Sequence, residues 1–219
     1  MDRTYFLDKL YPLQDKVLAV IGGIDSGFYL SGGTAASRGY LQHRLSEDLD
    51  FFVNDAADFS LWAQRLLDVL QDQWQVTVGL REERFVRLVV NAAEISLKIE
   101  LINDVPAHIG EIRVHPVLGR LDSAENILAN KVTAALDRNE AKDLADIWGF
   151  CCRYGLRLAA SIEDARSKAA GVFPADLARV LLSVTAEDWR LVRWNTPPRA
   201  DEFVSDLRAL GEDLLLQRG

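Results

Sequence analysis

The amino-acid sequence predicts an α+β protein, in which a mixed sheet with helices is followed by a helical C-terminal region. Short apolar runs, separated by polar or glycine-containing segments, recur through the first half of the chain and are typical of strands. From Ser123 onward, apolar residues recur at helical spacing almost to the end of the 219 residues. We therefore expect an α/β core over residues 1–121 and a helical region over residues 122–219.

The first half combines helical and strand patterns. Apolar residues recur every three to four positions from Thr4 to Ile21, as in an amphipathic helix, although Pro12 can split it. The pair Gly22-Gly23 is typical of a helix end. Further helices are expected at Thr34–Leu41 and Ala57–Gln71, and strands at Phe28–Leu30, Leu49–Val53, Gln75–Leu80, Phe85–Asn91 and Glu94–Ile102.

The second half carries repeated helix signals. Asp122 to Glu125 offers a cap in front of a periodic apolar run, which predicts a helix from Ser123. Further helices are expected at Glu140–Tyr154, Ile162–Ala170, Ala175–Ser183, Ala186–Val192 and Asp201–Gln217.

Composition and charge limit the possible partners. A net charge of −8 and a pI near 5.0 argue against a general, non-specific nucleic-acid coat. A local basic groove remains open, because Arg81, Arg84, Arg87 and Lys98 could flank an acidic site or form a solvated hairpin edge. No apolar stretch approaches the roughly 18 residues that a membrane span needs, and the N-terminus lacks a secretory signal pattern. A cytoplasmic protein with no membrane partner is expected.

A glycine-containing turn follows the first predicted strand. Ser31-Gly32-Gly33-Thr34 stands between the apolar run Phe28–Leu30 and a predicted helix. Adjacent glycines allow positive φ and a close approach of the backbone to a ligand, and the N–H groups at a helix start favour phosphate. The turn is therefore a candidate phosphate site, with an ordinary turn as the alternative.

Paired carboxylates open the second predicted strand. Asp48 and Asp50 are two residues apart and project from the same face of a strand, while Leu49 faces the core. Two convergent carboxylates suit Mg²⁺, which binds through one or two carboxylates plus substrate phosphates. A third carboxylate could come from Glu100, which shares a strand face with Ser96 and Lys98, and Asp104 is the competing choice.

These residues together resemble the signature of the AbiEii/AbiGii toxin family. The matching block runs from Ser31 to Ala35 and then from His43 to Phe52, with Arg44, Ser46 and both aspartates in it. The resemblance extends to about Gly149 and implies the fold of the DNA polymerase β-like nucleotidyltransferase superfamily.

The resemblance also implies a second group of site residues, on two helices. A lysine on one helix and an aspartate in a Lys-Asp-x-x-Asp stretch on the next carry over to Lys131 and to Asp143 or Asp146. Lys131 would neutralise triphosphate charge, whereas an ion-paired helix surface is the structural alternative. Arg44 and Ser46 would contact phosphate, orient Asp48 or hold the loop together.

The implied reaction is Mg²⁺-dependent transfer of a nucleoside monophosphate from an NTP to an acceptor hydroxyl. Asp48, Asp50 and Glu100 are the expected metal ligands, and Ser31 to Thr34 would cradle the triphosphate. The family implies the toxin of a toxin–antitoxin or phage-defence pair, with a cognate antitoxin protein as partner. It also implies RNA as acceptor, with the tRNA 3′ end as a candidate. The alternatives are a small-molecule nucleotidyltransferase and an inactive nucleotide- or antitoxin-binding module.

Overall fold

The computed structural model describes residues 3–216, which divide into two compact units. The first unit contains the chain up to Gly39 together with Leu45–Pro106 and Glu111–Asp122. The second contains Tyr40–Arg44, Ala107–Gly110 and the chain from Ser123 onward. The division into domains at residues 121 and 122 stays a prediction, because compactness does not tell whether either unit folds alone.

A mixed seven-stranded sheet forms the centre of the first unit, in the order β3-β4-β5-β2-β1-β7-β6. The pairs β2–β5 and β1–β7 are parallel, and the other neighbours are antiparallel. The strands are β1 (Tyr29–Ser31), β2 (Leu49–Asn54), β3 (Gln75–Arg81), β4 (Phe85–Ala92), β5 (Ile95–Asp104), β6 (Arg113–His115) and β7 (Gly119–Leu121).

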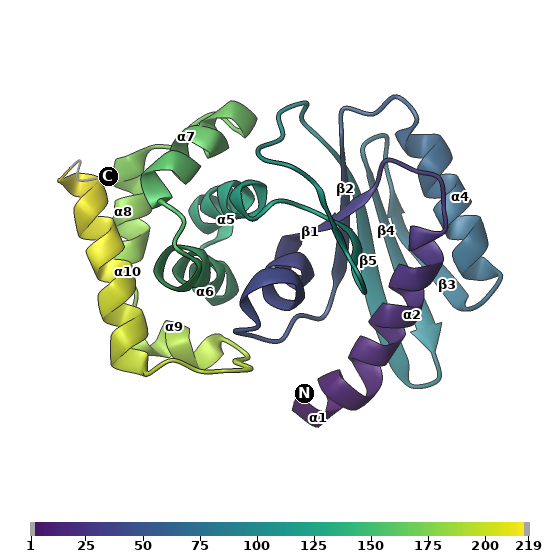
Figure 1. Cartoon of the computed structure of the whole chain (residues 1–219), viewed down its shortest axis with the longest axis horizontal. Coiled ribbons are helices and arrows are strands. Elements are labelled where there is room, and N and C mark those ends of the chain that lie inside the picture. Colours follow the sequence, from purple (N-terminus) through teal and green to yellow (C-terminus); the bar gives the residue numbers. More distant parts are fainter. Residues whose placement is uncertain (1–2, 217–219) are drawn as a thin grey trace. The chain divides into compact units, whose positions relative to one another are not determined.

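Helices α2 (Tyr11–Gly22) and α4 (Phe59–Gln71) cover one face of this sheet (Figure 1). Each helix buries apolar residues at three- and four-residue spacing, which gives it one continuous apolar face. Phe28, in front of β1, packs edge-on against Phe59 and Trp62 of α4. The sheet and the two helices therefore share one hydrophobic core.

Strict alternation along β2 and β5 separates the two faces of the sheet. Leu49, Phe51 and Val53 are buried, whereas the residues between them are partly exposed. Strand β5 alternates in the same way from Leu97 to Leu101. Because successive side chains of a strand point to opposite faces, Asp50 and Glu100 lie on the face that the helices leave uncovered.

The second unit is helical (Figure 1). The Ser123 hydroxyl accepts a hydrogen bond from the Asn126 N–H and caps its first long helix, as the sequence predicted. Trp148, Trp194 and Phe203 form an edge-to-face aromatic cluster in its core. The helices are α5 (Ala124–Arg138), α6 (Ala141–Trp148), the π-helical η3 (Gly149–Tyr154), α7 (Leu158–Lys168), α8 (Pro174–Leu182), α9 (Ala186–Leu191) and α10 (Ala200–Leu215).

The structure corrects several sequence-based boundaries. The N-terminal helical segment is divided just before Pro12: α1 (Arg3–Tyr5) and the π-helical η1 (Phe6–Leu10) precede α2, and Pro12 lies in the first turn of α2, where a missing N–H costs least. The expected helix at Thr34–Leu41 begins earlier, as α3 (Gly32–Thr34) and the π-helical η2 (Ala35–Leu41). Helix α10 ends at Leu215, and the predicted end at Gln217 lies outside the described residues.

The sequence did not predict strands β6 and β7. Each is only three residues long, and pairing holds them in the sheet rather than an apolar pattern of their own. Of the helices described between residues 3 and 216, none combines the length and the apolar composition that a bilayer crossing requires.

Candidate active site

The glycine turn lies directly against one of the paired acids. Strand β1 ends at Ser31, which is paired with Asp50 of β2, and Gly32 follows with a φ of +64°. A Cβ atom on Gly32 would overlap Oδ2 of Asp50. Only glycine fits at this position, because a side chain would be strained by the positive φ and would displace the carboxylate.

The turn is also tied to the segment that leads into β2. The Thr34 hydroxyl donates to the Asp48 carbonyl oxygen at 2.5 Å and lies 3.0 Å from the Ser46 hydroxyl oxygen. The side-chain amide of Gln14 donates to the Glu47 carbonyl oxygen at 2.9 Å. Helix α2 and the turn therefore both fix the backbone in front of the acids.

The carboxylates form a row across neighbouring strands. The parallel register of β2 and β5 pairs Asp50 with Glu100, and Asp48 lies two residues before Asp50. The competing candidate Asp104 is paired with Asn54, at the far end of β2. Between the two candidates for a third carboxylate, the register therefore favours Glu100.

Two cations lie along this row. Lys98 Nζ is 2.9 Å from Asp48 Oδ2 and 3.3 Å from Glu100 Oε1, and Arg87 Nη2 is 2.8 Å from the same Glu100 oxygen. Burial disfavours the charged ammonium of Lys98, but the carboxylates outweigh it and raise the pKa of Lys98 above its usual value. The other arginines of the hairpin point elsewhere, with Arg84 on Asp55 and Arg81 on Gln64.

The donor set of this row suits a hard cation. Asp48 and Asp50 supply carboxylate oxygens beside a turn that can approach phosphate, which is the combination that Mg²⁺ prefers. In the described part of the chain, no three His, Cys, Asp or Glu side chains are grouped so that they could hold a metal ion. Lys98 instead joins the outer two acids of the row.

The remaining predicted residues form a buried ionic cluster within the second unit. Lys131 Nζ lies 2.8 Å from Asp143 Oδ1 and 2.7 Å from Asp146 Oδ2. Arg44 donates to both oxygens of Asp146, at 2.7 Å each. His43 Nε2 donates to Asp146 Oδ1 at 3.0 Å, because a carboxylate can only accept. Both aspartate side chains are 0% exposed.

Electrostatics in this ionic cluster keep it charged despite its burial. Burial alone would raise the pKa of Asp146, but Arg44 and Lys131 outweigh it and hold that pKa well below the usual range. Burial lowers the pKa of His43, whose Nδ1 is buried with no hydrogen-bond partner among the described residues. A buried pair that loses one partner costs about 3–5 kcal/mol, so these residues depend strongly on one another.

The structure thus brings the predicted residues together in two groups, one in each unit. The acidic row and the turn contain Ser31, Gly32, Gly33, Thr34, Ser46, Asp48, Asp50 and Glu100. The ionic cluster contains Arg44, Lys131, Asp143 and Asp146. Their roles stay predictions. The sequence analysis did not predict that His43 contacts Asp146, although His43 stands beside Arg44 in the segment His43–Phe52.

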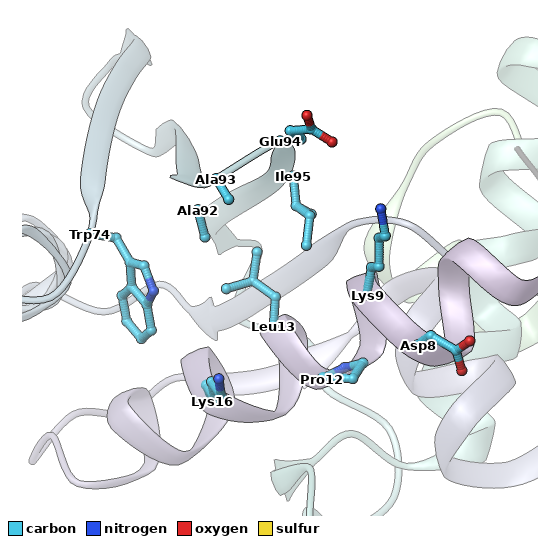
Figure 2. Close-up of a pocket in the computed structure, with 10 residues that line it drawn as sticks. All are labelled: Asp8, Lys9, Pro12, Leu13, Lys16, Trp74, Ala92, Ala93, Glu94 and Ile95. Atoms are coloured by element: carbon cyan, nitrogen blue, oxygen red, sulfur yellow. The ribbon is translucent and has the colours of Figure 1, made fainter.

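A surface hollow in the first unit is separate from the acidic row. It lies between the N-terminal helices and the β4–β5 turn, and Figure 2 shows Lys9, Leu13 and Trp74 among its lining side chains. None of the predicted site residues lines it. The hollow is therefore not the candidate active site.

Replacing Gly32 by alanine tests the contact with Asp50. We expect the free energy of unfolding to fall by about 1–3 kcal/mol, because the new Cβ is strained and displaces the carboxylate. Gly22→Ala is the matched control, since nothing lies within 4 Å of a Cβ built there. Urea denaturation measures both variants, and an equal stability of the two would contradict the contact.

The pH dependence of stability tests the ionic cluster. A neutral, buried His43 has a lowered pKa, so the unfolded chain takes up a proton first as the pH falls below about 6.5. We expect the free energy of unfolding to decrease from pH 7 to pH 5.5, and His43→Gln to reduce that slope. His108→Gln is the control and should keep it. A slope that is unchanged in His43→Gln would contradict a neutral His43.

Comparisons with known proteins agree with this architecture. The family model described as the nucleotidyl transferase AbiEii toxin of type IV toxin–antitoxin systems matches residues 18–197. A protein from H. pylori described as a candidate nucleotidyltransferase is similar in structure, with a TM-score of 0.65, 22% identity and coverage of 96% of each chain. JHP933 from Helicobacter pylori has a TM-score of 0.63 and 21% identity, over 95% of this chain and 91% of that chain.

Structural similarity at these identities shows the shared fold alone. A search of curated protein sequences gives no match. The family match, in contrast, spans most of the chain and includes the turn, the paired acids and the ionic cluster. The chain therefore belongs to the AbiEii family of nucleotidyltransferase toxins of type IV toxin–antitoxin systems.

Proposed function

We propose that the protein transfers a nucleoside monophosphate from an NTP to an acceptor hydroxyl. The acceptor oxygen bonds to the α-phosphorus and loses its proton to solvent, the bond from the α-phosphorus to the oxygen that bridges to the β-phosphate breaks, and pyrophosphate leaves. The single observation that carries this proposal is the position of Gly32 against the Asp50 carboxylate, which leaves no room for a side chain between them. It supports a common site for phosphate and metal, because an ion at the acid can then also reach phosphate oxygens.

Each residue of the turn and the acidic row has a part in this proposal. The N–H groups of Gly32, Gly33 and Thr34 bind the triphosphate, and the Ser31 end of β1 sets their position. Asp48 and Asp50 hold Mg²⁺, and Glu100 completes the row. When bound, Mg²⁺ supplies stabilisation of the charge on the attacking and leaving oxygens. Ser46 holds the loop through its contact with Thr34.

For the ionic cluster we propose a positioning role. Lys131 was expected to neutralise triphosphate charge, but its ammonium is engaged by two carboxylates and is 7% exposed. Asp146 holds Arg44, from which the chain runs in four residues to Asp48. Lys131, Asp143 and Asp146 would then position Arg44 within the second unit.

The type IV toxin–antitoxin family supports an antitoxin as partner. We propose an RNA acceptor, with the tRNA 3′ end as the first candidate, and a cognate antitoxin protein that restrains the activity in the cytoplasm. The net charge of −8 favours the second candidate function, transfer to a small-molecule alcohol, because an acidic protein attracts RNA weakly. A role in phage defence belongs to the same proposal.

Labelled nucleotide transfer tests the reaction. The wild-type protein, incubated with each α-labelled NTP, Mg²⁺ and total RNA, should label RNA. Asp50→Asn should reduce transfer by at least about 100-fold, because it removes a charge that holds the ion while keeping the side chain's shape. Asp72→Asn, an exposed aspartate at the end of α4, is the matched control and should transfer normally.

The outcomes separate the candidate functions. Transfer to an aminoglycoside-type alcohol but not to RNA would favour the small-molecule enzyme. Equal transfer by Asp50→Asn and the wild type would refute the assigned site. Binding of NTP without any transfer would favour the inactive module. Expression in bacteria adds a cellular readout, since a toxin should slow growth and Asp50→Asn should relieve that effect.

A further inference from the structure

A lysine ammonium is built into the acidic row. Lys98 Nζ lies 2.9 Å from Asp48 Oδ2 and 3.3 Å from Glu100 Oε1, so it joins the two outer acids of the row. Its side chain is 37% exposed, and that of Asp48 is 36% exposed. This half-buried position differs from a freely solvated surface lysine, whose ammonium has no fixed partner.

Strand register rather than chance fixes the position of this ammonium. Lys98 and Glu100 stand two residues apart on β5, with the fully buried Leu97, Ile99 and Leu101 pointing to the opposite face. The parallel register pairs Leu49 with Ile99, and Asp48 and Lys98 each precede this pair by one residue. A shift of one residue would bury the lysine in the core, so the register determines that Lys98 lies on the same face as the acids.

Charges along the row leave little room for a second divalent ion. The row contains three carboxylates, those of Asp48, Asp50 and Glu100. Two cationic side chains, Lys98 and Arg87, form ion pairs with acids of the row. Glu100 Oε1 already faces both Lys98 and Arg87. A divalent ion between Asp48 and Glu100 would have to lie where the ammonium lies and would be repelled by it.

We propose that the Lys98 ammonium takes the place of one of two divalent cations, so that the site binds a single Mg²⁺ through Asp48 and Asp50 together with the triphosphate. Glu100 then holds Lys98 rather than a second ion. This inference rests on the proposed function, because it concerns the same nucleotide site. The proposal also explains the presence of Glu100 without a second metal ion, because Glu100 holds Lys98.

Counting bound Mn²⁺ tests the proposal without measuring activity. Mn²⁺ replaces Mg²⁺ at oxygen sites, and electron paramagnetic resonance separates free from bound ions in a titration of protein saturated with a non-hydrolysable NTP analogue. The wild type should bind one Mn²⁺ per protein. Lys98→Met should bind two, because the space and the charge are released, and Lys98→Arg should remain at one. Lys16→Met, an exposed lysine on α2, is the matched control and should also bind one.

Each outcome decides the proposal. Two ions in the wild type would overturn it and leave the proposed function standing. One ion in both wild type and Lys98→Met would also overturn it, because Lys98 would then exclude nothing. Neither ion nor nucleotide in the wild type would overturn this inference and the proposed function together. Circular dichroism checks that the variants fold, and Lys98→Gln replaces Lys98→Met if the latter does not.

Discussion

The antiparallel pairing of β1 with β2 is the constraint on which the candidate site depends. It sets Ser31 opposite Asp50, and the chain must then turn at Gly32 with a positive φ to pass the carboxylate. The parallel pairing of β2 with β5 adds Glu100 to the other side of Asp50. A glycine turn beside a row of acids thus follows from two strand pairings, before any side chain makes a hydrogen bond.

The acidic row and the ionic cluster differ in how far their side chains are exposed. Along the acidic row the carboxylates are partly exposed, with Glu100 at 18%, so a ligand can reach them. Lys131, Asp143 and Asp146 are enclosed and satisfy one another, and such a buried network fixes geometry at the cost of desolvation. The family resemblance alone implies that the residues of the acidic row and those of the ionic cluster both contact the substrate. The burial of the second group favours a positioning role for it.

Local patterns in the sequence were sufficient to predict that the acids lie on one face of the sheet. The two-residue spacing of Asp48 and Asp50, and of Lys98 and Glu100, determines their faces without knowledge of the fold. The pairing of Lys98 with Asp48 depends on register between strands that stand far apart in the chain, and no local pattern encodes it. The same holds for Arg44 and Asp146, which are separated by 102 residues. Strands β6 and β7 were missed because their three residues, unlike the apolar run that marks β1, form no apolar pattern.

The most direct measurement locates the metal. Crystals grown with Mn²⁺ and a non-hydrolysable NTP should give an anomalous difference peak about 2 Å from carboxylate oxygens of Asp48 and Asp50. The same ion should contact phosphate oxygens held by the backbone of Gly32 to Thr34. A nucleotide bound away from this turn, or an ion that contacts neither aspartate, would contradict the account.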